Sequence, residues 1–556
     1  MIRDLNRLSS QTFDLLVIGA GIHGACVARD AALRGLSVAL IDRGDFGHAT
    51  SANSLKVVHG GLRYLQDANL GLARTMARER STWLRIAPHL VRPMPCLLPT
   101  SRTLMRSRPM MAAALAINDW LRPADDASTG GSHQAWPASQ TIGRDECLRA
   151  MPGLPAGRVT GGAQWHDAQI SSTERLLIAT VLSAVQCGAV AANYVKASGF
   201  VRKASRIGGV EAVDELTGQQ FEIPARVVIN SAGPWVDSVI DLLGTRSACT
   251  RFRPSLAVNL VTRQVLADCA VGIYRQSSPT FFVVPWREYS LIGTMHQHVE
   301  RVRDDWKPGD DLVCHFLDQI NSAYPGAALS RDDVFHVHWG FLPLAHRAGP
   351  NGSVKLMREG CVHDHEREDG ITGLISVVGV KYTTARYVAQ IAVDLAYKKL
   401  DRSPVACRTA VTPLHGGDLE SLDRFLSGAL AVQADTLEPT TIAHLVHGHG
   451  SEYLRVVECS RDNPSLVEPV AHNTPVIGAE VINAVRHEMA QSLDDVVRRR
   501  TELGSAGRPD QRGVEVCADL MAAELGWDSA RKEREIAEVY RAYPLRMSAA
   551  SRLEAN

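Results

Sequence analysis

A glycine-rich turn between an apolar strand and a helix constrains this chain more than any other feature. Residues 13–19, FDLLVIG, form a short apolar run that ends in glycine, as expected of a buried parallel strand. Residues 22–34 follow with helical periodicity, and residues 37–42, SVALID, form a second apolar run. The sequence therefore predicts a βαβ unit of about thirty residues, which is the half-domain that binds nucleotides.

Three glycines in this turn have the G-x-G-x-x-G spacing. Gly19 permits the tight turn, Gly21 lets the backbone approach a pyrophosphate, and Gly24 lets helix and strand pack closely. The helix offers unpaired N–H groups and the positive end of its dipole to a phosphate. Asp42 ends the second strand, where a carboxylate accepts hydrogen bonds from ribose hydroxyls. The alternative is a core βαβ turn without a ligand, but the strand, helix and acid together favour dinucleotide binding.

The rest of the chain continues this α/β pattern and then changes to helices. Residues 226–235 and 373–386 repeat the order of apolar strand, glycine, and turn or helix. From about residue 404 the spacing of apolar residues becomes helical, and residues 492–500, SLDDVVRRR, begin like a capped helix. Strand character is also predicted at 281–294 and 333–344, and helical spacing at 480–490.

Composition is that of an ordinary soluble globular protein. Of the 556 residues, 45% are hydrophobic and 22% charged, and 60 basic residues balance 60 acidic ones. This balance excludes a wholly disordered chain and the bulk basic field of a nucleic-acid-binding protein. No run reaches the roughly 18–20 apolar residues of a membrane span. The eleven cysteines are scattered, without a C-x-x-C pair, and the N-terminus has no signal-peptide pattern. We therefore expect a cytoplasmic location.

The segment after Asp42 extends the motif into a longer signature. Residues 43–66, RGDFGHATSANSLKVVHGGLRYLQ, with DLLVIGAGIHGACVARDAALRG before them, resemble the FAD-dependent (aerobic) glycerol-3-phosphate dehydrogenase family. The resemblance continues through NSAGPW, VPWREYSLIGT, GVKYTTAR and EMAQSLDDVVRRRTELG, so it spans nearly the whole chain. It implies an α/β (α+β) fold with a Rossmann-type FAD-binding domain, an interleaved antiparallel-sheet substrate domain and a C-terminal helical domain.

The same resemblance gives domain limits. Residues 1–403 are expected to form the FAD-dependent oxidoreductase region, and residues 404–556 the helical C-terminal domain. The FAD-binding segments are about 12–90, 160–240 and 355–400, and the substrate-domain segments are about 90–160 and 245–350.

The reaction that the resemblance implies is oxidation of a secondary alcohol to a ketone, with hydride passing to the flavin. The electrons then go to a quinone or to oxygen. The implied substrate is glycerol 3-phosphate or a related anionic, phosphorylated polyol, and a homodimer is the expected assembly. Two other classes stay open: an FAD-dependent oxidase of an amine or amino acid, and a flavin-binding protein without dehydrogenase activity.

Three residues are predicted to be catalytic: His59, Arg63 and Lys381. A histidine near neutrality suits removal of the alcohol proton, although a packed or flavin-orienting histidine explains His59 equally well. Arg63 and Tyr64 match positions that line the substrate, and a guanidinium fork suits phosphate. Lys381 and Arg358 match positions beside the substrate and its phosphate.

The predicted cofactor-binding residues lie along the glycine turn, the polar turn after the second strand, and the two later strand ends. They are Gly19, Gly21, Gly24, Asp42, Thr50, Ser51, Ser54, Lys56, His59, Gly60, Gly61, Ala232, Gly233, Trp235, Gly379, Lys381 and Thr383.

The sequence departs from the family on the substrate side. Leu342 stands where the family has an arginine in G-x-R-P-L, and the acid that follows I-G-T-T in the family is missing from the run at residues 292–296, IGTMH. Residues 254–257, PSLA, replace a K-G-S-H-like stretch. Loss of a charged donor at the reacting centre weakens transition-state stabilisation, so we expect a substrate whose reacting end differs from plain glycerol 3-phosphate. His338, His346 and Arg347 are the candidates for the missing role.

Two further features of the sequence concern metal binding and membrane contact. The H-x-H pairs 296/298, 336/338 and 363/365 lack the third and fourth ligands that zinc needs, so no metal site is predicted. Residues 89–118 carry four arginines, no acid and the run PMMAAALAI, which is typical of an interfacial segment. Peripheral contact with the inner face of a membrane is therefore one interpretation, and an insertion packed on the protein or covering the active site is the other.

Overall fold

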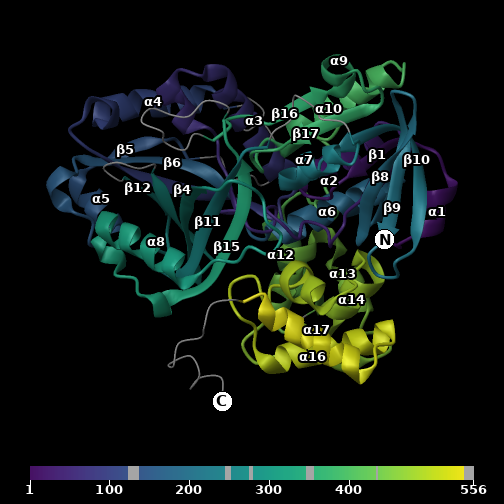
Figure 1. The fold of residues 1–556 in the computed structure, drawn as a ribbon. Helices are drawn as coiled ribbons and strands as arrows, with labels where there is room; N and C mark the ends of the chain where they lie inside the picture. Colours follow the sequence, from purple (N-terminus) through teal and green to yellow (C-terminus); the bar gives the residue numbers. More distant parts are fainter. Residues whose placement is uncertain (123–136, 245–251, 275–279, 346–355, 434–435, 544–556) are drawn as a thin grey trace.

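Two β-sheets and a group of C-terminal helices make up the fold in the computed structural model (Figure 1), which describes all residues except 123–136, 245–251, 275–279, 346–355, 434–435 and 544–556. The predicted βαβ unit is present, with β1 (Phe13–Ile18), α2 (Ile22–Leu33) and β2 (Val38–Ile41). β1 pairs in parallel with β2, as expected for two buried apolar runs joined by a helix.

The first sheet is the Rossmann-type part of the fold. β1, β2, β7, β10 and β17 run parallel, and α2, α6 (Thr173–Gln186) and α10 (Ala385–Lys399) pack together on it. The strand order is β16 (Cys361–Asp364), β17 (Leu374–Val378), β10 (Gln220–Asn230), β1, β2 and β7 (Val190–Ala192), with β9 (Arg206–Asp214) joining β10 to β8 (Val195–Lys203).

The second sheet is mostly antiparallel. Its core side is covered by α8 (Asp310–Ala323) and α5 (Arg144–Ala150), and alternate residues of β11 such as Leu256 and Val258 pack into that core. The order is β15 (Val334–Pro343), β11 (Pro254–Arg263), β14 (Tyr289–His298), β13 (Phe281–Trp286), β12 (Ala270–Ile273), β4 (Val91–Thr100), β6 (Gly161–Ile170) and β3 (Val57–Val58), with β5 (Gln140–Ile142) beside β6. β3 and β6 fall in segments expected to bind FAD, but both pair within this second sheet.

The C-terminal helices form a separate cluster at the bottom of Figure 1. They are α11 (Leu422–Gln433), α12 (Pro439–His449), α13 (Tyr453–Glu458), α14 (Gly478–Glu488), α15 (Leu493–Asp495), α16 (Gln511–Leu525) and α17 (Ser529–Arg541). The other helices are α1 (Leu5–Ser10), α3 (Leu70–Ile86), α4 (Arg108–Trp120), α7 (Val236–Asp241) and α9 (His365–Asp369). No helix among the described residues is both long and apolar enough to cross a membrane.

The capped helix predicted at residues 492–500 fixes the C-terminal helices to the first sheet. Ser492 caps α15 in a capping box with Asp495, and a π-helical turn follows at Val496–Arg500. This turn directs Arg499 and Arg500 at the buried carboxylate of Asp45, with N···O distances of 2.7 and 2.8 Å. Asp45 lies in the loop after β2, so the C-terminal region holds the loop that follows the dinucleotide motif.

Candidate active site

A cavity of about 520 Å³ opens where the parallel strands of the first sheet end. Four segments line it directly after their strands: Gly19 after β1, Asp42 after β2, Ser231 after β10 and Gly379 after β17. Ligands of open α/β sheets bind at this carboxyl edge. From the second sheet, Ala257, Asn259, Thr294 and Leu342 face the same cavity, so it lies between the two sheets.

The three glycines of the motif differ in what a Cβ atom at each position would contact. Gly19 has φ +95°, and a Cβ there would lie 2.6 Å from the Ser231 carbonyl oxygen. A Cβ on Gly24 would lie 1.8 Å from the Gly19 carbonyl oxygen. At Gly21, which lines the cavity, a Cβ would meet only the Ser51 Oγ, at 3.2 Å. The fold therefore requires Gly19 and Gly24, whereas the bare backbone at Gly21 is explained by a ligand.

Asp42 is fixed at the end of β2 by backbone donors. The N–H groups of Ala20 and Gly44 donate to its carboxylate at 2.7 and 3.0 Å. The residue is only 7% exposed, and burial raises its pKa. A carboxylate held rigidly at this position suits ribose hydroxyls.

Two buried polar atoms at the cavity have no hydrogen-bond partner among the described residues: Ser231 Oγ and His23 Nε2. His23 lies inside the G-x-G-x-x-G motif, and burial lowers its pKa to about 4. A Cβ on Gly379 would lie 2.2 Å from the His23 ring, so that glycine leaves room for the imidazole. His23 was missed by sequence reasoning because it occupies a variable position of the motif. These atoms, the glycine cradle and Asp42 fit a bound dinucleotide.

Three side chains from both halves of the oxidoreductase region meet at the mouth of the cavity. The Arg43 guanidinium lies 4.3 Å from the Trp235 ring centre and forms a 2.8 Å ion pair with Asp304. Trp235 Nε1 donates to the same carboxylate at 2.6 Å. Asp304 comes from the connection between β14 and α8, so this contact joins the second sheet to the dinucleotide edge.

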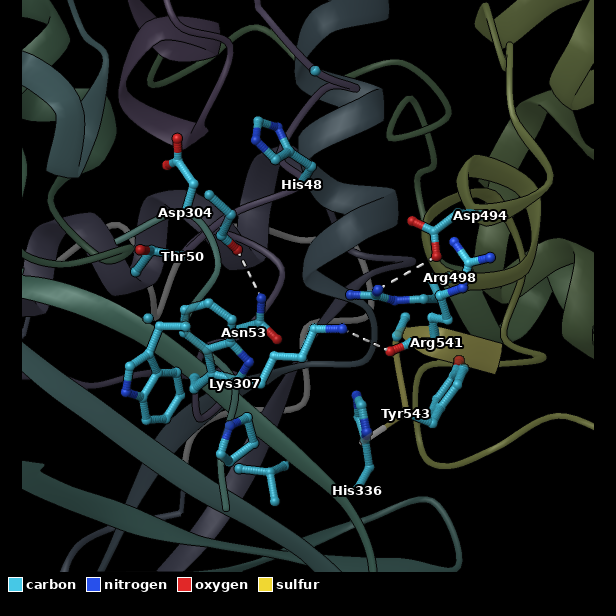
Figure 2. A pocket seen from close by; sticks show the side chains of 18 of the residues that line it. His48, Thr50, Asn53, Asp304, Lys307, His336, Asp494, Arg498, Arg541 and Tyr543 are labelled. Atoms are coloured by element: carbon cyan, nitrogen blue, oxygen red, sulfur yellow. Dashed lines mark hydrogen bonds and ion pairs between the residues drawn. The ribbon is translucent and has the colours of Figure 1, made fainter. Parts of the chain in front are cut away.

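A larger cavity, of about 1020 Å³, adjoins the first one, and Figure 2 shows side chains that line it. His48, Thr50 and Asn53 line both cavities. The C-terminal helices contribute Arg498, which pairs with Asp494 at 3.3 Å, and Arg541, whose carbonyl accepts from Lys307 at 3.1 Å. The larger cavity contains none of the predicted catalytic residues, so we place the chemistry in the smaller one.

The structure brings the predicted substrate-side cations together. Lys381 lines the dinucleotide cavity, donates to the Arg358 carbonyl, and lies 5.2 Å from the centre of the buried Tyr64 ring. The Arg63 guanidinium lies 5.6 Å from the same ring. Burial and the neighbouring Arg63 lower the pKa of Lys381 to about 8. These four residues are called here the cation cluster, and of them Lys381 lines the cavity.

Two histidines border this cluster. The His59 ring lies 6.0 Å from the Tyr64 ring, and burial, with Lys381 and Arg63 nearby, lowers its pKa to about 3. Burial and Arg63 likewise lower the pKa of His296 to about 4. The His296 Nδ1 is buried and has no hydrogen-bond partner among the described residues. Sequence reasoning weighed His296 only as a metal ligand. Its place directly after the altered I-G-T-M run is the signal that could have identified it.

Several predicted cofactor residues have packing roles instead of a place on the cavity wall. Lys56 Nζ forms a buried ion pair with Glu174 at 2.9 Å. A Cβ on Gly60 would lie 2.1 Å from the Arg80 guanidinium, and one on Gly61 2.9 Å from Met76 Cβ. The Thr383 carbonyl accepts a hydrogen bond from Trp83 of α3. By contrast, the predicted cofactor residues that do line the cavity are Gly19, Gly21, Asp42, Thr50, Ser51, Ser54, Ala232, Gly233, Trp235, Gly379 and Lys381.

The structure also shows where the residues lie that depart from the family pattern on the substrate side. Leu342 lines the cavity, whereas Met295 is 8% exposed and packs in the core of the second sheet. His338 contacts the Ser505 carbonyl at 2.9 Å and lies four residues from Leu342 along β15, about 13 Å away. His346 and Arg347 lie outside the described residues. Within the described ranges, no group of three or more His, Cys, Asp or Glu side chains is placed to hold a metal ion.

Comparisons with known proteins show which protein families this chain matches. Residues 14–395 match the family described as FAD dependent oxidoreductase, and residues 407–532 match the C-terminal domain of alpha-glycerophosphate oxidase. The chain is 30% identical over 550 residues to a glycerol-3-phosphate dehydrogenase of Synechocystis sp., covering 96% of this chain and 97% of that one. It is 31% identical over 541 residues to glycerol-3-phosphate dehydrogenase 2 of Mycobacterium tuberculosis, covering 96% and 88%.

A solved structure shares the fold. The glycerol-3-phosphate dehydrogenase from Bacillus halodurans, complexed with FAD, superimposes with a TM-score of 0.77 at 24% sequence identity. The match covers 98% of both chains, so it includes both sheets and the C-terminal helices.

Proposed function

Because the chain belongs to the FAD dependent oxidoreductase family, we propose that it oxidises the secondary hydroxyl of a phosphorylated polyol, glycerol 3-phosphate or a close relative, to a ketone. The cation cluster carries this proposal. Arg63 and Lys381 lie 5.6 and 5.2 Å from the centre of the Tyr64 ring. Lys381 also donates to the Arg358 carbonyl and lines the cofactor cavity. Arginine forks bind phosphate bidentately, so a substrate anchored there presents its carbon chain to the cofactor.

The chemistry supplied by bound FAD is acceptance of a hydride from the carbinol carbon. The hydroxyl proton must go to a base of this chain. A base works best when its pKa lies near the working pH. Lys381, with a pKa of about 8, meets that condition, while His59, with a pKa of about 3, is a weak base. We therefore assign proton removal to Lys381 Nζ, and a neutral, substrate-orienting role to His59.

Anaerobic reduction of the flavin tests this proposal. Glycerol 3-phosphate and related phosphorylated polyols are expected to bleach the 450 nm band, while glycine and proline leave it unchanged. Bleaching by an amine or amino acid alone would instead establish the oxidase alternative, and no bleaching by any of them the flavin-binding alternative. The electron acceptor, quinone or oxygen, and a homodimer stay predictions.

Arginine at position 342 is expected to speed reduction by glycerol 3-phosphate. Leu342 lines the cavity where a cation would hydrogen-bond the developing ketone oxygen, an interaction stronger in the transition state than in the ground state. The gain for Leu342→Arg should be roughly tenfold or more. Leu342→Met is the matched uncharged control, and the melting temperature of each variant is measured first. Rapid wild-type reduction at low substrate concentration would contradict the idea that the substrate preference has shifted.

We also propose contact of residues 102–120 with an anionic membrane surface. Met111 and Leu115 of α4 are buried, so one face of the helix packs on the protein, as the alternative interpretation expected. The opposite face and the turn before it leave large apolar side chains exposed: Leu104 (74%), Met105 (50%), Met110 (39%), Ile117 (40%) and Trp120 (78%). Apolar residues beside arginines are typical of interfacial binding.

Reversing two arginine charges should weaken this contact. Arg102→Glu with Arg106→Glu is expected to lower affinity for phosphatidylglycerol vesicles at least about tenfold, since each basic residue near such a surface contributes about 1 kcal/mol. Wild-type binding should also weaken with salt. Arg461→Glu, at an exposed position of the C-terminal region, is the control in a sedimentation assay. Equal binding of all three proteins would leave α4 with a packing role only.

A further inference from the structure

A second group of arginines lines a cleft that shares no lining residue with the cofactor cavity and contains no residue of the cation cluster. Arg74, Arg78 and Arg85 follow one another on α3 at spacings of four and seven residues, which places them on one helix face. They line a cleft of about 700 Å³ with Trp120, at the end of α4, and Arg386, near the start of α10. Figure 1 shows these three helices along the upper edge of the molecule. None of the residues lining this cleft lines the dinucleotide cavity.

The charges of this arginine cleft are strongly unbalanced. Among the described residues that line it there is a single carboxylate, Glu79, which is buried and already bound by Arg386 through N···O contacts of 2.8 and 2.5 Å. Arg122, also in the lining, pairs with Asp119. The acid therefore does not neutralise the three arginines of α3.

Those three arginines have free donors. Arg74 and Arg78 are exposed, and in the described part of the chain neither forms an ion pair or a side-chain hydrogen bond. Arg85 donates through Nε to the Ala410 carbonyl at 3.3 Å, which leaves its terminal nitrogens for a ligand. Like charges one helical turn apart repel each other. A bound anion would relieve this repulsion and accept the free donors.

We propose that the arginine cleft binds the phosphate group of an anionic ligand at a site separate from the substrate. Guanidinium groups match phosphate in geometry and charge, and the volume is within the range of small-molecule sites, so it also admits the organic group that carries the phosphate. Trp120, 78% exposed, gives the cleft an apolar rim. Two sources share this chemistry, a free phosphate compound and a phospholipid headgroup.

The first arm of the test titrates the holoenzyme with inorganic phosphate and pyrophosphate at low salt. Tryptophan fluorescence is compared between wild type and Trp120→Phe, because a response that needs Trp120 comes from this cleft. Arg74→Gln with Arg78→Gln is expected to raise the dissociation constant roughly tenfold or more. Binding at the cation cluster would persist in this double variant and perturb the flavin spectrum, so it is not counted.

The second arm uses vesicles of phosphatidylglycerol and of phosphatidylcholine, with Arg461→Gln, at an exposed position of the C-terminal region, as the control. Weaker binding of the double variant, but not of the control, to phosphatidylglycerol alone would assign the site to a headgroup. A Trp120-dependent response to free phosphate that the double variant loses would assign it to a soluble ligand. If wild type and double variant behave alike in both arms, with equal melting temperatures, the proposal is overturned. None of these three outcomes depends on turnover of a polyol, so the proposed function is tested separately.

Discussion

Replacing Lys381 by methionine is expected to slow anaerobic flavin reduction roughly 10²–10⁴-fold, the range for loss of a positioned general base. Methionine keeps the apolar stem and removes the amine that faces both the cavity and the Arg358 carbonyl. The measurement is stopped-flow reduction at saturating substrate, with the FAD content and melting temperature of each protein determined first.

Lys381→Arg separates the two roles that a lysine can play here. Arginine keeps the positive charge but does not lose its proton in this pH range. If Lys381 Nζ removes the hydroxyl proton, the arginine variant is nearly as slow as the methionine variant. If the charge alone matters, arginine restores most of the rate, and the assignment of the base fails.

The pH dependence gives a further check on the same residue. Below about pH 8 the Lys381 amine is protonated and cannot accept a proton, and above that value it is neutral. The wild-type reduction rate should therefore rise with pH and level off above about 8. The methionine and arginine variants should lose this step. A rate that instead falls through pH 8 would indicate that the charged form is the active one.

Gly21→Val should abolish stable FAD binding while leaving the fold intact. A Cβ at Gly21 meets only the flexible Ser51 Oγ within the protein, so the added atoms occupy the space where the backbone approaches the pyrophosphate. Overpacking of about 3 kcal/mol corresponds to a roughly 100-fold loss of affinity. The readout is the ratio of flavin to protein absorbance in the purified protein, with FAD titration of the apoprotein.

Two further glycine substitutions serve as controls for Gly21→Val. Gly428→Val lies in α11, where a Cβ meets nothing within 4 Å, and should retain full FAD content. Gly24→Ala should destabilise the protein itself, since its Cβ would lie 1.8 Å from a carbonyl oxygen. Full FAD occupancy in Gly21→Val would show that the pyrophosphate does not lie against this turn.

The sequence determined the parts of this protein that depend on near neighbours in the chain. The strand at residues 13–18, the helix at 22–33 and the glycines between them follow from periodicity and turn chemistry. The same holds for Asp42 at its strand end and for the cap at Ser492. These features determined the dinucleotide edge of the sheet and with it the fold class, whereas FAD as the cofactor followed from the resemblance of residues 43–66 to the family.

Only the tertiary structure decided which polar residues face the cavity and which pack. Lys56 lies in the signature loop, but its partner Glu174 is 118 residues away, and burying an amine requires such an ion pair. Asp45 likewise depends on Arg500, 455 residues later. His23 and the arginine cleft show no distinctive local pattern, because their surroundings come from segments that meet only when the sheets and helices pack. The sequence encodes each local element, whereas burial and charge at the sites depend on the packing between them.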